Sequence, residues 1–143
     1  MASNTSPIYS SAGDIQWSAT ALIAGNPAYD GTGTVATVFT AGNSGSFVQR
    51  VRFKASGSTT ATVARIFINN SSSSVTASNN FLFDEVTLAA ITATSASATT
   101  VYEVPMNIAL PAGYKILATA AIAPAGAGGG WFVGAVGGSY LPI

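Results

Sequence analysis

The segment FVQRVRFK, residues 47–54, alternates apolar and polar side chains with the two-residue period of a half-buried β-strand. Because neighbouring side chains of a strand point to opposite faces, the alternation predicts an apolar face for the core and a cationic face. The predicted core face holds Phe47, Gln49, Val51 and Phe53, and the opposite face holds Val48, Arg50, Arg52 and Lys54. The cationic stripe is about 14 Å long, since same-face neighbours lie about 6.8 Å apart.

Segments of the same kind recur along the chain, rich in β-branched and aromatic residues and separated by clusters of Gly, Asn, Ser and Pro. We predict strands at 14–23, 34–41, 46–55, 60–69, 81–89, 100–110, 114–122 and 131–140. Eight short strands with turn signals about every 8–12 residues are typical of all-β sandwiches and barrels. The predicted fold is an eight-stranded, jelly-roll-like β-sandwich, and an immunoglobulin-like sandwich is the alternative.

The two ends of the chain differ in character. Residues 1–13 are rich in Ser and Asn, so we predict an extended N-terminal arm followed by a single β-sandwich domain over 14–143. The arm has neither the basic leader nor the apolar core of a signal peptide. Residues 116–143 carry no charge over a length that would span a bilayer, but their glycines and prolines favour two strands joined by a turn. We therefore expect no membrane segment.

Charge is scarce throughout the chain. Charged residues make up 7% of the 143 residues and the formal net charge is zero, whereas about 25% of the residues of a typical domain are charged. Because colloidal repulsion requires net charge, a monomer with such a surface would be poorly soluble. A subunit that buries its surface against other copies would not be, so the composition favours an obligate assembly.

The residue types exclude most catalytic chemistry. The chain has no cysteine and no histidine, which excludes disulfides, thiolate chemistry, His-dependent triads and His-based metal sites. A carboxylate-based hydrolase is disfavoured because the neighbours Asp84 and Glu85 point to opposite faces of a predicted strand. The sequence GTGTVA at 31–36 matches a dinucleotide fingerprint only formally, since a strand follows it rather than a helix. We expect no enzyme, no metal and no cofactor.

The cationic stripe of residues 50–54 has three possible interpretations. It is an ordinary solvated face, or it guards an edge strand against pairing with other chains, or it docks an acidic partner. Arg65, on the next predicted strand, would extend the stripe across a hairpin. Nucleic acid is not an expected partner, because only these few basic residues cluster in a chain without net charge.

Aromatic neighbours and the arm supply further interface candidates. Trp131 and Phe132 are adjacent on a predicted strand, so one belongs in the core and the other faces outward as a subunit contact. The candidate interface residues are Arg50, Arg52, Lys54, Arg65, Trp131, Phe132 and, in the arm, Pro7, Ile8 and Tyr9.

A string of short motifs carries a family resemblance over residues 29–140. The stretch YDGTGTVATVFTAGNSGSFVQRVRFKASGSTTATVARIFINN is followed in order by NNFLFDEVTL, VPMNIALPAGYKILAT and WFVGAVGGSY. Together they resemble small proteins encoded in the structural-gene regions of tailed bacteriophages, such as capsid decoration (cement) proteins and related virion accessory subunits. The resemblance implies a β-sandwich, commonly jelly-roll-like and trimeric, without catalytic residues.

This resemblance leads to an expected function. The chain would be a homotrimer bound to the major capsid protein on the virion surface, where it stabilises the shell, and it would be synthesised in the host cytoplasm. The alternative is a head-fibre or receptor-binding module that recognises glycans, for which Trp17 or Trp131 would supply the exposed aromatic ring.

Overall fold

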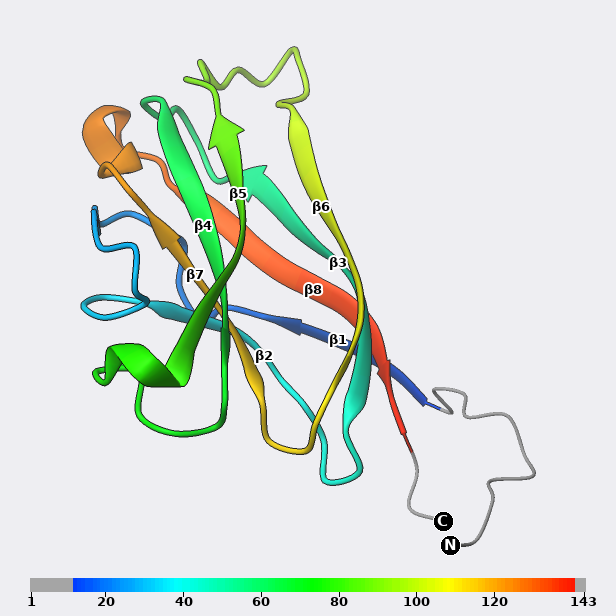
Figure 1. The fold of residues 1–143 in the computed structure, drawn as a ribbon. Helices are drawn as coiled ribbons and strands as arrows, with labels where there is room; N and C mark the ends of the chain where they lie inside the picture. The colour runs from blue at the N-terminus through cyan, green and yellow to red at the C-terminus, as the bar shows by residue number, and fades with distance from the viewer. Residues whose placement is uncertain (1–11, 141–143) are drawn as a thin grey trace, which may run out of the picture.

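The computed structural model describes residues 12–140, apart from the side chains of 126 and 127, as two four-stranded antiparallel sheets packed face to face (Figure 1). The first sheet consists, in spatial order, of β1 (Ala12–Trp17), β8 (Trp131–Ser139), β3 (Ser46–Ala55) and β6 (Val101–Leu110). The second consists of β2 (Ala36–Thr40), β7 (Lys115–Ala120), β4 (Thr62–Asn69) and β5 (Asn80–Leu88). Two short 3-10 helices, η1 (Ala77–Asn79) and η2 (Pro124–Ala127), lie in the loops.

The strand pairing is that of a jelly roll. The pairs β1–β8, β2–β7, β3–β6 and β4–β5 are nested, as though one long hairpin had been rolled into two sheets. This order confirms the predicted eight-stranded, jelly-roll-like sandwich. An immunoglobulin sandwich would place its first, second, fourth and fifth strands in one sheet, so that alternative is wrong.

The first strand and the arm differ from their predicted bounds. Strand β1 begins at Ala12 and ends at Trp17, and its first two residues pair with the end of β8. The predicted arm of 1–13 is therefore at least two residues too long, and its candidates Pro7, Ile8 and Tyr9 lie outside the described residues. The regular strand ends at Trp17, six residues before the predicted end at 23. Ser18 still donates its N–H to the carbonyl of Val133, and its hydroxyl donates to the carbonyl of Thr20 in the turn that follows.

The hydrophobic core lies between the two sheets. Its largest fully buried side chains are Phe39, Phe53, Ile66, Leu88, Ile116 and Trp131. Burial of each such side chain contributes about 1.5–3 kcal/mol to folding, relative to leaving it in water. Of the uncharged segment that begins at Ile116, the part up to residue 140 contributes most of β7 and all of β8, and within residues 12–140 no helix is long and apolar enough to cross a bilayer.

A β-bulge in β3 changes which of its residues face the core. The register with both neighbouring strands shifts between Val48 and Arg50, and one extra residue reverses the alternation. Val48, Val51 and Phe53 are fully buried, Gln49 is exposed and Phe47 is partly exposed. The predicted core positions of Val51 and Phe53 are confirmed. Upstream of the shift the predicted faces are wrong: Val48 is in the core, and Phe47 and Gln49 are not.

Strand β3 is also not an edge strand. It pairs with β6 on one side and with β8 on the other, so its backbone needs no protection from other chains. The edges of the first sheet are β1 and β6, and those of the second are β2 and β5. The interpretation of the basic residues as an edge guard is therefore wrong, and the solvated face and the docking surface remain.

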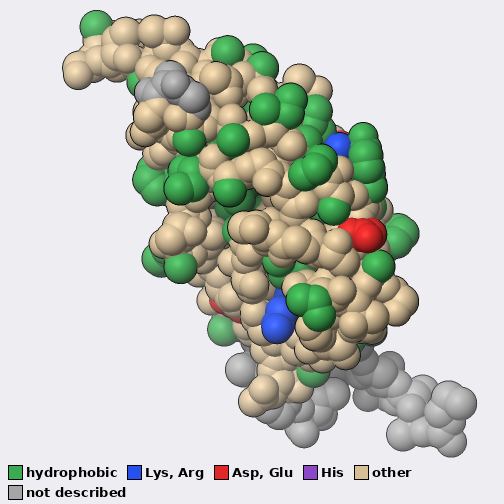
Figure 2. Space-filling model, turned by 90° about the vertical axis from the view of Figure 1, so that its left-hand side faces the viewer, with side chains coloured by type: hydrophobic (Ala, Val, Ile, Leu, Met, Phe, Trp, Pro, Cys, Tyr) green, Lys and Arg blue, Asp and Glu red, His purple; other side chains and the backbone are tan. Residues whose placement is uncertain are grey.

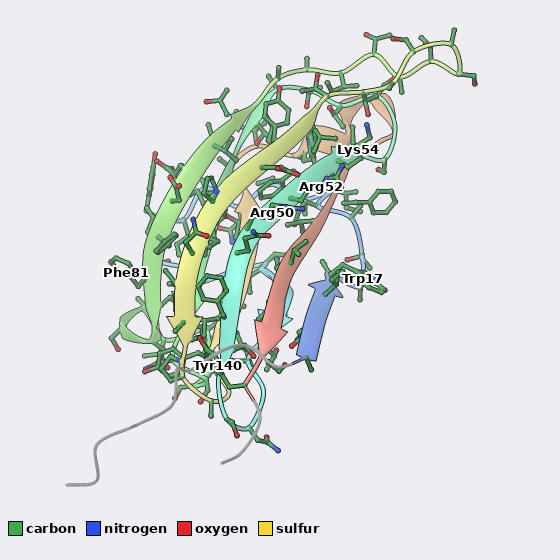
Figure 3. All side chains as sticks on the ribbon, turned by 90° about the vertical axis from the view of Figure 1, so that its right-hand side faces the viewer. Trp17, Arg50, Arg52, Lys54, Phe81 and Tyr140 are labelled. Carbon is green, nitrogen blue, oxygen red and sulfur yellow. The ribbon has the colours of Figure 1, made fainter. Side chains whose placement is uncertain are left out.

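The two sheets differ in what lies on their outer sides. The segment between β1 and β2 crosses from the first sheet to the second. The N–H groups of Ser18 and Leu22 still donate to carbonyls of β8. Farther along, the N–H of Asn26 donates to the carbonyl of Ala120, and the carbonyl of Pro27 accepts from Arg65. In Figure 1 this loop and the loop before β5 lie on the side of the second sheet. The outer face of the first sheet carries the basic residues of β3 and a surface groove beside them (Figure 3).

Candidate functional site: the outer groove of the first sheet

A groove with a volume of about 790 Å³ runs over the outer face of the first sheet, lined by residues of β1, β8 and β3. We call it the outer groove. Figure 3 shows Trp17 at the end of β1, on one side, and Arg50, Arg52 and Lys54 along β3, on the other. Between them β8 forms the floor.

The middle of the groove is a row of three residues at one level. Trp17 pairs with Gly134, and Gly134 pairs with Arg52. Adjacent strands lie about 4.8 Å apart, so the backbones of Trp17 and Arg52 are separated by about 9.6 Å. Because Gly134 has no side chain, the floor is open between a large aromatic ring and a guanidinium.

The neighbouring rows of paired residues also combine an apolar side chain with a cation. Ile15 pairs with Val136, which pairs with Arg50, and Phe132 pairs with Lys54. Each row therefore places an apolar side chain beside a cation. The groove has an apolar wall on β1, a cationic wall on β3 and a floor of mainly apolar or small residues on β8.

The large apolar side chains of the groove are unusually exposed. The exposed fractions of Trp17 and Ile15, on the β1 wall, are 72% and 64%, and that of Phe132, on β8, is 57%. Single exposed apolar residues are common on protein surfaces, but contiguous ones beside polar groups mark interaction sites. These three residues line the same groove, so the patch is contiguous and has the character of a binding surface.

The cationic wall is incompletely neutralised. Oε1 of Glu103, on β6, lies 3.5 Å from Nε of Arg50 and 3.6 Å from Nε of Arg52, and all three side chains are partly exposed. Lys54 donates to the carbonyl of Thr99. Three cations and one carboxylate leave a local charge of +2, whereas the chain as a whole has none.

The exposed guanidinium of Arg52 retains unused hydrogen-bond donors, because within residues 12–140 no group accepts a hydrogen bond from it. In Arg50, Nη1 donates to Gln49, whereas Nε is buried and has no hydrogen-bond partner. The contacts with Glu103 are therefore charge contacts without hydrogen-bond geometry. Surface pairs of this kind contribute about 0–1 kcal/mol, so a ligand carboxylate can compete for these donors.

Arg65 does not extend the stripe, contrary to the prediction. It lies on β4, in the second sheet, because the chain crosses between the sheets after β3 instead of turning back as a hairpin. Its side chain is 6% exposed. Nε lies 2.8 Å from Oε1 of Glu85, Nη1 donates to the carbonyl of Pro27, and the guanidinium stacks on Tyr29, 3.6 Å from the ring centroid. Arg65 is thus an internal contact between a strand and the loop over it.

The two adjacent aromatic residues separate as predicted. Trp131 is fully buried and meets Tyr102 edge to face, with ring centroids 5.6 Å apart, whereas Phe132 is exposed in the outer groove. Trp131 is therefore not a surface candidate, either for a subunit contact or for a glycan. The exposed indole is that of Trp17.

Sequence reasoning missed part of the groove. Ile15 and Trp17 were recognisable as same-face neighbours, and the alternation of Phe132, Gly134 and Val136 is also visible in the sequence. Neither pattern states that the two segments are adjacent or that they share a face with the basic residues. That information is in the pairing of β1 with β8 and of β8 with β3.

The carboxylates all have partners. Asp14 accepts from Gln16 and Ser139, and Glu85 pairs with Arg65. Asp30 accepts from the hydroxyl and the N–H of Thr32, and these hydrogen bonds, the hydroxyl's first, lower the pKa of its carboxyl. Within residues 12–140 no three metal-ligating side chains cluster.

Comparison with known proteins gives no match to a family model, to a curated protein or to a solved structure.

Proposed function

We propose that this chain is a non-catalytic structural protein of a virion, which binds the major capsid protein at the capsid surface as a homotrimer and docks through the outer groove. One observation carries the docking role: Ile15, Trp17 and Phe132 are exposed beside three cations on the outer face of the first sheet. The phage origin of the partner comes from the resemblance of residues 29–140 to virion accessory proteins.

The energetics suit a repeated, moderate contact. Full burial of a large apolar side chain contributes about 1.5–3 kcal/mol, and a buried aromatic anchor near cations is typical of interface hot spots. A trimer would make this contact three times on one shell. Linked weak contacts bind far more tightly than each does alone.

The surface composition supports self-association. The face in Figure 2 shows hydrophobic side chains scattered among uncharged ones, with few charges. Such a surface has little electrostatic repulsion between copies. The homotrimer is tested by the mass of the purified chain in native mass spectrometry at tens of micromolar, where a monomer would contradict it.

Docking is tested by cosedimentation with capsid shells that lack this protein. We expect Trp17→Ala and Arg52→Glu each to reduce binding at least tenfold while the fold and the oligomeric mass stay unchanged (about 1.4 kcal/mol for each factor of ten). The matched controls lie in the second sheet: Phe81→Ala removes an aromatic ring that is 64% exposed, and Lys115→Glu reverses a charge outside the groove. Equal effects of the controls, or full binding by both groove variants, would contradict docking through the groove.

Glycan recognition is the second candidate function. The specific observation in its favour is Trp17, which presents an exposed indole beside the open floor at Gly134, because aromatic rings stack on the apolar faces of sugars. Binding to a glycan array that Trp17→Ala abolishes and Phe81→Ala leaves intact, with no loss of shell binding, would favour this function over capsid docking.

A further inference from the structure

We propose that the outer groove binds an extended peptide segment in which acidic and apolar residues alternate. This inference rests on the proposed function, because it gives the chemistry of the partner segment that the groove would bind.

The spacing of the side chains along each wall of the groove matches that of an extended peptide. Ile15 and Trp17 are two residues apart on β1, and Arg50, Arg52 and Lys54 follow the same period on β3. Same-face neighbours of a strand repeat about every 6.8 Å. An extended peptide lying along the floor, with its side chains directed toward the two walls, repeats on each side at that spacing. Alternate side chains of the peptide would therefore face the β1 wall and the β3 wall at the same repeat as the wall residues.

The chemistry of the walls sets which side chains these are. The β1 wall is apolar, and the β3 wall carries a local charge of +2 with unused donors on the exposed guanidinium of Arg52. Carboxylates on every second residue would face Arg50 and Arg52, and apolar side chains on the intervening residues would face Ile15 and Trp17. Arginine favours this arrangement, because its planar fork binds a carboxylate through two parallel hydrogen bonds.

Gly134 sets where the peptide lies deepest. It occupies the floor between Trp17 and Arg52, and a glycine allows another backbone to approach closely. An added Cβ there would lie 3.2 Å from the carbonyl oxygen of Gln16 and 3.4 Å from Cβ of Trp17. Because no side chain stands there between Trp17 and Arg52, we expect the bound segment to be centred on Gly134.

The occupant is not a segment of another copy of this chain. The five acidic residues are Asp14, Asp30, Asp84, Glu85 and Glu103, and no two of them are separated by a single residue. Residues 1–11 contain no acid at all. No part of the sequence has the alternating acidic pattern, so the segment belongs to a different chain, consistent with a capsid partner.

Glu103 is the internal competitor for this site. Its carboxylate already lies near Nε of both arginines, and an incoming carboxylate must share or displace it. Removing its charge raises the local charge from +2 to +3. We therefore expect Glu103→Gln to strengthen binding of the peptide, whereas a docking surface that used only apolar contact would be insensitive to this change.

The experiment measures fluorescence anisotropy of labelled peptides with the full chain. The probe is an eight-residue Glu-Leu repeat, compared with a Glu-Glu-Leu-Leu repeat of the same composition and with a Lys-Leu repeat. We expect the alternating acidic peptide to bind about tenfold more tightly than its rearranged counterpart, and the Lys-Leu peptide not to bind. Arg52→Gln should weaken binding about tenfold and Glu103→Gln should strengthen it about threefold, while the control Lys115→Gln leaves it unchanged.

Two results would overturn the inference. One is equal binding of the alternating and rearranged peptides, which would show that spacing is not recognised. The other is binding of a soluble polyuronate with no binding of any peptide, which would assign the groove to an acidic glycan. In either case, the proposed docking to the capsid would still be supported if cosedimentation with shells depended on Trp17 and Arg52. If Trp17→Ala and Arg52→Glu left cosedimentation unchanged, docking through the groove would be wrong as well.

Discussion

The side chain of Gln16, in β1, forms two hydrogen bonds with the backbone of Thr40, in β2: Nε2 donates to the carbonyl and Oε1 accepts from the N–H, each at 2.9 Å. These bonds join the edge strands of the two sheets at one side of the sandwich. Because neighbours on a strand face opposite ways, the inward position of Gln16 directs Ile15 and Trp17 outward. The residue that closes this side of the sandwich therefore also presents the apolar wall of the outer groove.

Replacing Gln16 with leucine should destabilise the fold. The change removes both hydrogen bonds and leaves the N–H and carbonyl of Thr40 without them, at a cost of about 1–3 kcal/mol. Urea unfolding followed by circular dichroism measures the loss. The exposed Gln49 provides the control, since Gln49→Leu should change the free energy of unfolding by no more than about 0.5 kcal/mol. Equal losses for both variants would contradict the role of Gln16.

We expect that even the conservative replacement of Arg65 by lysine destabilises the fold. Lysine keeps the charge but loses the fork that contacts Glu85, the carbonyl of Pro27 and the ring of Tyr29 together. We expect Arg65→Lys to lower the free energy of unfolding by about 1–3 kcal/mol, since Glu85 is partly exposed and is solvated once unpaired. Arg52→Lys, at an exposed arginine, is the matched control and should have almost no effect. Similar unfolding midpoints for the two variants would show that the fork contributes nothing.

Deleting Gln49 tests the bulge in β3. Without the extra residue, strict alternation would send either Val48 outward or the basic residues inward. We expect a loss of more than about 4 kcal/mol or failure to fold, because a charge or an apolar residue would be on the wrong face. Soluble yield and thermal unfolding measure the effect. Deletion of Ser73, in the loop before η1, is the control; a Gln49 deletion that is as stable as this variant would contradict the argument.

A side chain at Gly134, on the groove floor, should weaken shell binding more than it destabilises the fold. Gly134→Ala adds a methyl group with tight contacts to Gln16 and Trp17, and we expect a loss of stability below about 1.5 kcal/mol and a severalfold loss in shell binding. Gly13→Ala, also in the first sheet, is the control because an added Cβ there meets no atom within 4 Å. Shell cosedimentation at full strength in Gly134→Ala would argue against close approach at this position.

The carboxyl of Asp30 should titrate below its ordinary pKa of 3.8, because the hydroxyl and the N–H of Thr32 stabilise the charged form. A depressed pKa contributes stability above the unfolded-state pKa, and this contribution is lost as the pH falls through the folded-state pKa. Thr32→Val removes the hydroxyl donor, so the pKa should rise toward the ordinary value in a carbon-13 NMR titration. Thr32→Ser keeps the donor and should leave the pKa low; a rise with serine as well would assign the effect to another cause.

Much of the fold was predictable from local pattern. The strand positions, the all-β class and the outward direction of Arg50, Arg52 and Lys54 follow from side-chain alternation and from turn residues, which depend only on neighbours in the chain. The separation of Trp131 and Phe132 to opposite faces follows for the same reason. These features are properties of a strand wherever it lies in the fold.

The remainder depended on which strands meet. The sequence alone determined that β3 has a cationic face, but only the tertiary structure placed Ile15, Trp17 and Phe132 on that face, moved Arg65 to the second sheet and made β3 an interior strand. The bulge at Val48 and Arg50 reversed the upstream alternation, and Gly137 permits it, because an added Cβ there would lie 2.2 Å from the carbonyl oxygen of Phe47. Pairing between distant segments is decided by the packing of the whole core, and no local period in the sequence encodes it.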